Sequence, residues 1–170
     1  MDSDFKDGAL ISDYSVGVGD IDENLEPQVI RRIIRDTYLR DSEVTVLLSG
    51  LETRYRKHVD WELKSSMIDG KVNGRSGIVV IDLPSSGSTS WHAAFPDEKK
   101  AIYADYEGPW TTISTKTEYE NRYPNMPGRI IENLLKDDVK IPIVPWDRIY
   151  GYPERLSYLL AQAAIVGRLC

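Results

Sequence analysis

Hydrophobic positions along this chain fall into short apolar runs separated by longer amphipathic stretches. Two of the runs, Val44–Leu48 and Gly77–Leu83, are almost wholly apolar, which is typical of strands buried on both faces of a sheet. Ala9–Ile11 predicts a further short strand, and Lys140–Val144 predicts an edge strand because its internal proline cannot donate to a ladder. The runs therefore predict a sheet with short strands.

Between these runs, apolar residues recur at helical spacing. Helices are expected from Asn24 or Pro27 to Arg40, around Val59, Leu63 and Met67, over Arg129–Leu135, and from Pro153 onwards. Arg31, Arg32 and Arg35 are expected on the solvated face of the first of these helices. The alternation of strands and helices predicts one domain over residues 1–170. Its expected fold is α/β, a three-layer open and mostly parallel sheet with helices on both faces.

Composition narrows the classes of function. The formal net charge is −6, which argues against non-specific duplex binding, and we expect no nucleic-acid partner. No apolar run approaches the ~20 residues of a membrane-spanning helix. The acidic start Met1–Asp7 does not resemble a signal peptide. The only cysteine is Cys170, so no disulfide framework is possible. A cytoplasmic protein with no membrane partner is expected.

The segment after Val44–Leu48 carries the strongest candidate chemistry. Ser49 and Gly50 end the strand, a basic loop follows, and Asp60, Trp61 and Glu62 are expected in the first turn of a helix. Ligands of open α/β sheets bind at this carboxyl end of the strands. A carboxylate beside an indole is partly desolvated, so Glu62 could act as base, nucleophile or stabiliser of a cationic sugar. An acid in a first turn also complements the helix dipole, and spacing leaves both interpretations open.

Other motifs are less specific. Arg54, Arg56 and Lys57 form either a solvated loop or a clamp for phosphates. No metal site is expected, since zinc needs three or four ligands and the chain has only two histidines, with no cysteine near His58. The loop Gly17–Asn24 lacks the third glycine of a dinucleotide fingerprint but could cover a pocket. The tryptophans are expected in the core or at its rim, and a role in stacking on a nucleobase stays open for Trp61, Trp91, Trp110 and Trp146.

Several pieces of the chain resemble the bacterial TIR-like domains, a flavodoxin-like group that includes the TIR proteins of the Thoeris anti-phage systems. The segment Arg56–Glu62, with the sequence Arg-Lys-His-Val-Asp-Trp-Glu, is specific to this group. The resemblance runs from Asp13 to Leu83, and more loosely over Pro142–Trp146. The other similar pieces are Asp13–Val16, Gly19–Asp22, Ile30–Arg35 and Tyr38–Ser42.

The resemblance implies an enzyme that cleaves the nicotinamide–ribose bond of NAD, in many prokaryotic members to make a cyclic or modified ADP-ribose signal. NAD is then the substrate, and no separate cofactor is needed. The family's catalytic glutamate falls on Glu62. Asp13 and Ser49 would lie at strand ends beside the pocket, with Arg54 and Trp61 also binding the nucleotide.

The same resemblance implies that the loop Gly17–Asn24 covers the pocket and mediates self-association into a homo-oligomer. The family's sheet has the strand order 2-1-3-4-5. This chain begins near the second of these strands, so the first strand, which carries part of the nucleotide pocket, is expected to be missing.

Two alternatives to an enzyme remain open. One is a non-enzymatic TIR-like module that only oligomerises or recruits a partner. The other is a receiver-like domain that binds nucleotides without turnover.

Overall fold

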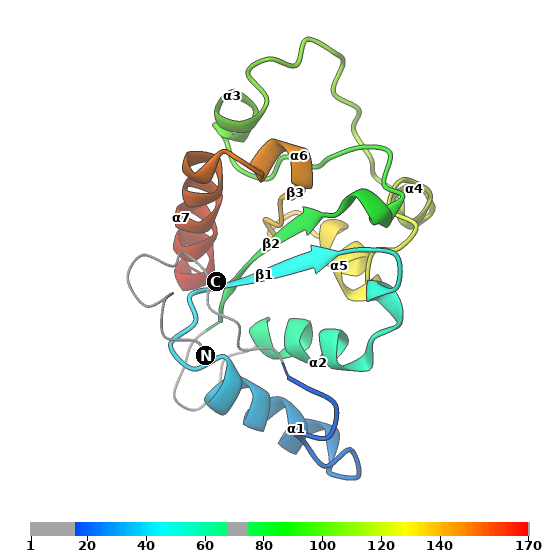
Figure 1. Ribbon diagram of the computed structural model, residues 1–170, viewed down its shortest axis with the longest axis vertical. Coiled ribbons are helices and arrows are strands. Elements are labelled where there is room, and N and C mark those ends of the chain that lie inside the picture. The colour runs from blue at the N-terminus through cyan, green and yellow to red at the C-terminus, as the bar shows by residue number, and fades with distance from the viewer. Residues whose placement is uncertain (1–15, 68–74, 170) are drawn as a thin grey trace.

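The computed structural model describes residues 16–67 and 75–169, with no account of the side chains of residues 168 and 169. The strand expected at Ala9–Ile11 lies outside the described residues. Figure 1 shows a small sheet with helices on its two sides. Within the described part of the chain, no helix is long and apolar enough to cross a membrane.

The sheet has three parallel strands in the order β1-β2-β3: Val44–Ser49, Gly77–Asp82 and Ile143–Pro145. Every residue of the central strand β2 is buried, as predicted. β1 was expected to be buried on both faces as well, and this is wrong. Among the described residues β1 pairs only with β2, and its Leu48 is 50% exposed. β3 is confirmed as an edge strand of the described sheet, short and bounded by prolines.

The predicted helices are all present. They are α1 Pro27–Ile33, continued by the π-helical turn η1 Ile34–Tyr38, then α2 Lys57–Ser66, α5 Gly128–Leu134 and α7 Pro153–Leu169. Shorter elements lie between them: η2 Thr53–Tyr55, η3 Pro84–Ser86, α3 Glu98–Ile102, α4 Lys116–Arg122 and α6 Trp146–Ile149.

Helices cover both faces of the sheet, which confirms the α/β class. One core joins the sheet to α2, α4 and α5 around Leu47, Leu63 and Ile130. The other joins it to α3, α6 and α7 around Val79 and Leu159. The tryptophans Trp91, Trp110 and Trp146 pack at the rim of this second core, as expected.

α1 packs against α2, away from the sheet, and a third small core fills the space between them. It is built from Val16, Ile21, Ile30, Ile34 and Leu39. Figure 1 shows α1 as the element furthest from β2 on this side. The segment before α1 is thereby held next to α2.

Arg35 departs from the prediction that it is solvated, since its side chain is 1% exposed. Its Nη1 donates to Ser76 Oγ at 2.8 Å, and Ser76 Oγ in turn donates to the Ser42 carbonyl at 2.8 Å. Arg35 belongs to the π-helical turn, whose wider spiral shifts the register of the side chains that follow α1. A regular helical period therefore misplaces it.

Candidate functional site around Glu62

Glu62 lies in the second turn of α2, because the helix begins at Lys57 and not at Asp60 as expected. Asp60 is the acidic residue of the first turn. The effect of the helix dipole fades within that turn. Complementing the dipole therefore accounts for Asp60 and not for Glu62.

The half-buried Glu62 side chain joins α2 to the segment that precedes α1. Its Oε1 accepts a hydrogen bond from the backbone N–H of Val16 at 2.5 Å. A second contact follows a few residues on, where Lys57 Nζ donates to Glu23 Oε2 at 2.8 Å. His58 Nε2 lies 3.9 Å from the other oxygen of Glu23. The loop Gly17–Asn24 is thus held against the beginning of α2, next to Glu62.

Trp61 is half-buried in the third core, against the residues of α1. Lys57 Nζ lies 4.8 Å from the centroid of its ring, a cation–π contact. The ring of His58 packs edge-on against it at 5.2 Å. In this structure the indole therefore stabilises the junction of α1 with α2.

A bidentate ion pair fixes the first turn of α2 to α5. Arg129 donates to both carboxylate oxygens of Asp60, at 2.7 and 3.0 Å. Fork-like pairs of this kind are the most directional that arginine makes. The pair sets the direction in which α2 leaves the loop after β1, and hence the position of Glu62.

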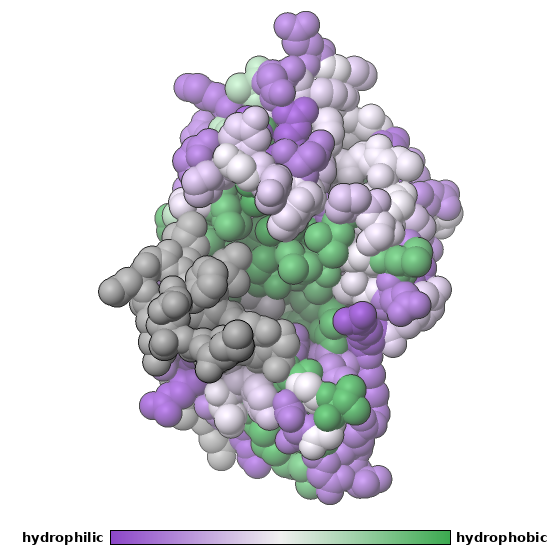
Figure 2. Space-filling view, viewed as in Figure 1, coloured by the Kyte–Doolittle hydropathy of each residue, from purple (hydrophilic) through white to green (hydrophobic). Residues whose placement is uncertain are grey.

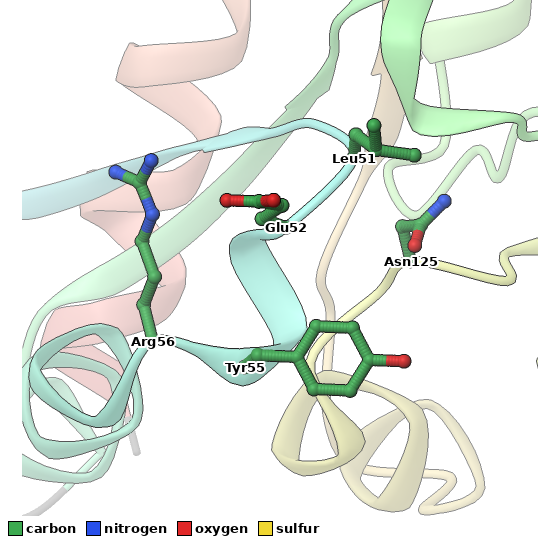
Figure 3. A pocket seen from close by; sticks show the side chains of 5 residues that line it. All are labelled: Leu51, Glu52, Tyr55, Arg56 and Asn125. Carbon is green, nitrogen blue, oxygen red and sulfur yellow. The ribbon is translucent and has the colours of Figure 1, made fainter.

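The basic loop after β1 borders a depression of about 620 Å³. Its lining residues are Leu51, Glu52, Tyr55, Arg56 and Asn125. Figure 3 shows Glu52 and Arg56 on one side of it and Leu51, Tyr55 and Asn125 on the other. Glu62, Ser49, Arg54 and Trp61 do not line it, so the predicted residues do not converge on one cavity here.

Two further predicted site residues, Arg54 and Ser49, have different surroundings. Arg54 Nη1 donates to the carbonyl of Pro124 at 2.5 Å, and its guanidinium lies 5.3 Å from the centroid of the Tyr55 ring. Ser49 is fully buried at the end of β1. The fifth predicted site residue, Asp13, lies outside the described residues.

Asp82, a residue that sequence reasoning passed over, lies beside Ser49. The two are register partners at the carboxyl ends of β1 and β2. Asp82 is 5% exposed, and burial raises the pKa of its carboxyl from 3.8 to about 6. The hydroxyls of Ser88 and Ser49 lower that pKa, although neither makes a hydrogen bond of regular geometry to the carboxylate. The signal in the sequence was an acid that ends an otherwise apolar strand and precedes a loop rich in serine.

A second buried carboxylate, Glu98, has a different setting. Its Oε2 accepts the backbone N–H groups of Ala94 and Phe95, at 2.8 and 3.1 Å, and burial raises its pKa to about 7. It ties a loop together on the α7 side of the sheet. Among the described residues, no three acidic, histidine or cysteine side chains converge as metal ligands would.

Comparison with known proteins gives one match. The family model of the TIR-like domain of the Thoeris protein ThsB matches residues 3–88, half of the chain. The matched part contains β1, α2, β2 and Val16, whose N–H bonds to Glu62. No curated protein and no solved structure matches the chain.

Proposed function

The chain belongs to the family of TIR-like domains of the Thoeris protein ThsB, a family of anti-phage defence, and from that membership we propose that it cleaves the nicotinamide–ribose bond of NAD. Glu62 is the catalytic carboxylate in this proposal. The product is free nicotinamide together with ADP-ribose or a cyclic derivative of it, which serves as a signal.

One observation carries the proposal. Glu62 is half-buried in the second turn of α2, where the helix dipole no longer stabilises an acidic side chain. It follows the carboxyl end of β1 in the chain. It faces the residue before the loop Gly17–Asn24, because the Val16 N–H bonds to its Oε1. A carboxylate kept at this edge of a parallel sheet, under a loop, is placed as a catalytic group would be.

The chemistry needs one carboxylate and no metal or redox partner. When the bond between ribose C1′ and the nicotinamide nitrogen breaks, the bonding electron pair leaves with the ring and neutralises its positive charge. The ribose becomes an oxocarbenium-like cation, which the negative charge of Glu62 stabilises. Water that adds to C1′ and loses a proton gives ADP-ribose, whereas a nucleophile within the substrate gives a cyclic product.

The other predicted site residues have supporting roles in this proposal. Arg54 and Arg56, on the loop after β1, supply positive charge for the pyrophosphate. Trp61 shields Glu62 from water and so strengthens its electrostatic effect. Ser49 supports the floor beneath the nucleotide, and Asp13 contributes from the segment before the loop.

Nicotinamide release from NAD tests the proposal. Wild-type protein, Glu62→Gln and Glu62→Ala are incubated with NAD at high protein concentration, and free nicotinamide is followed by chromatography. We expect both variants to lose at least about 100-fold in rate, as is typical when a charge aimed at the transition state is removed. Glu26→Gln, which changes an exposed acid at the start of α1, is the matched control and should keep the wild-type rate. Equal rates in wild type and both Glu62 variants would contradict the proposal.

The surface along β1 supports a second candidate, a non-enzymatic module that associates with itself. Hydrophobic residues gather at the surface over β1 (Figure 2), where Leu48 is 50% exposed, and Leu51 beyond the strand is 61% exposed. Contiguous exposed apolar residues mark interaction sites. Sedimentation of wild type and Leu48→Lys over a range of concentrations tests this. A wild type that stays monomeric at every concentration would exclude it.

A further inference from the structure

The carboxyl edge of the sheet holds a polar cluster built around Asp82. Its carboxylate ends the central strand, with Ser49 of β1 as its neighbour in register. The turn η3 Pro84–Ser86 and Ser88 follow directly in the chain. Tyr123 lies close enough for the charge of Asp82 to contribute to its raised pKa, although burial is the larger cause. Besides burial, the groups that shift the pKa of Asp82 are the hydroxyls of Ser88 and Ser49.

The carboxylate of Asp82 is poorly satisfied by hydrogen bonds from the described residues. Neither of its oxygens accepts a hydrogen bond of regular geometry from the described residues, and the hydroxyl of Ser49 is in the same position. A buried acid without such partners costs stability. Natural chains keep groups of this kind chiefly where a ligand or a reaction uses them.

The depression shown in Figure 3 is linked to the turn η3, which begins two residues after Asp82. Asn125, one of its lining residues, donates from Nδ2 to the carbonyl of Ser86 at 2.9 Å. In the middle of the turn, Ser85 lies next to Gly50, where a Cβ would be 3.1 Å from the Ser85 Oγ. The turn therefore lies against both Asn125 of the depression and Gly50, next to Ser49. It must shift for a ligand in the depression to reach the buried Asp82 oxygens.

The chemistry of the depression complements that of Asp82. The depression offers the 75% exposed ring of Tyr55 to a base and the guanidinium of Arg56 to a phosphate. Asp82 offers two acceptor oxygens to a group that donates hydrogen bonds. A metal ion suits Asp82 less well, because the groups nearest to it are hydroxyls and not further carboxylates.

We propose that Asp82 accepts hydrogen bonds from ribose hydroxyls of a nucleotide that enters from the depression between Tyr55 and Asn125. This inference rests on the proposed function, because it assigns a subsite for the same substrate. It adds a binding residue for the ribose, separate from Glu62, and gives Tyr55 and Arg56 the base and the phosphates.

Calorimetric titration with ADP-ribose tests the assignment, because this probe binds without being cleaved at the nicotinamide bond. The variants are Asp82→Asn, Tyr55→Ala and, as a matched control at an exposed aspartate, Asp138→Asn. We expect Asp82→Asn to weaken binding at least about 10-fold, the typical loss for a hydrogen bond to a charged group. Asp138→Asn should bind as the wild type does. Tyr55→Ala, at an exposed side chain that leaves the fold intact, should also bind more weakly.

Analogues of ADP-ribose that lack hydroxyls on one ribose or the other separate binding from a structural role. Wild type should bind one of these analogues about 10-fold more weakly than it binds ADP-ribose. Asp82→Asn should bind that same analogue as tightly as wild type does. Any of three results would overturn the inference. These are an equal loss of affinity on every analogue, an Asp82→Asn affinity for ADP-ribose within twofold of wild type, and a wild type that binds no ADP-ribose.

Nicotinamide release, measured in parallel, keeps this result apart from the proposed function. If the protein binds ADP-ribose through Asp82 but releases no nicotinamide, the result supports the subsite and contradicts the catalytic proposal. If the wild type cleaves NAD and Asp82→Asn binds ADP-ribose with unchanged affinity, the result supports the catalytic proposal and contradicts the subsite.

Discussion

The backbone N–H of Val16 donates to Glu62 Oε1 at 2.5 Å, across 46 positions of sequence. This hydrogen bond joins the segment before α1 to the second turn of α2. Val16 is itself buried in the small core beside Trp61. The acid that we propose as catalytic is therefore also the acceptor that fixes the residue before the loop Gly17–Asn24.

The two Glu62 variants should differ in how they hold Val16. Glu62→Gln keeps an acceptor oxygen for the Val16 N–H, whereas Glu62→Ala leaves that buried donor without one. We expect hydrogen exchange at the Val16 amide to speed up about 10-fold or more in Glu62→Ala, as a lost bond to a charged acceptor is worth about 1.5–3 kcal/mol. The increase in Glu62→Gln should be smaller. Exchange measured by NMR checks this, and equal rates in all three proteins would show that the bond is not formed in solution.

The Asp60–Arg129 pair should couple the stabilities of α2 and α5. Its side chains are 47% and 24% exposed, so solvent screening limits its strength. A double-mutant cycle with Asp60→Ala and Arg129→Ala, read by chemical denaturation, should give a coupling free energy of about 1 kcal/mol. The coupling should weaken in high salt. A coupling near zero at low salt would mean that the two side chains act independently.

The order of helices and strands could be predicted from the sequence because each element has its own pattern. β2 is wholly apolar up to Asp82 and proves to be wholly buried. β1 is nearly as apolar, yet Leu48 is half exposed, because burial depends on what a strand lies against as well as on its composition. Arg35 was placed on the wrong face because a π-helical turn interrupts the helical period.

The site was predictable only in part. Glu62 and its neighbours stand out as a motif, but the helix start was misplaced by three residues, because Arg56 caps α2 without a side-chain hydrogen bond. Asp82 ends an apolar run but matches no known motif, and its closeness to Ser49 depends on the pairing of two strands in the fold. No helix was expected from the sequence between residues 91 and 123, although the capping box of Thr115 and Glu118 marks the start of α4.

Gly77 should tolerate no side chain, because β2 and α7 touch there. A Cβ on Gly77 would lie 2.0 Å from the carbonyl oxygen of Ala163, in the backbone of α7. We expect Gly77→Ala to lower the free energy of unfolding by about 3 kcal/mol or more, since the backbone itself must shift. Gly128→Ala is the matched control. A Cβ there meets no atom within 4 Å, and alanine favours a helix, so stability should stay equal or rise slightly. Urea denaturation of both variants checks the contrast, and equal midpoints would contradict it.

The buried carboxyl of Asp82 should make stability fall as the pH rises. Its pKa in the folded protein is raised from 3.8 to about 6, so the folded state holds this proton more tightly than the unfolded state does. Its contribution is therefore most favourable below about pH 4 and is lost as the pH rises towards 6. Asp82→Asn removes this dependence, because asparagine carries no charge at any of these values.

The stability of Asp82→Asn relative to wild type should therefore increase between pH 4 and pH 7. At about 1.4 kcal/mol per pKa unit, the increase should be about 2 to 3 kcal/mol. Urea denaturation of both proteins across this range measures it, with Asp138→Asn as the exposed control that should stay parallel to wild type. If the Asp82→Asn curve also stays parallel to wild type, the carboxylate is not desolvated in solution. If it rises as expected, the fold keeps at the carboxyl edge of its sheet an acid that destabilises it, which is how a binding residue would behave.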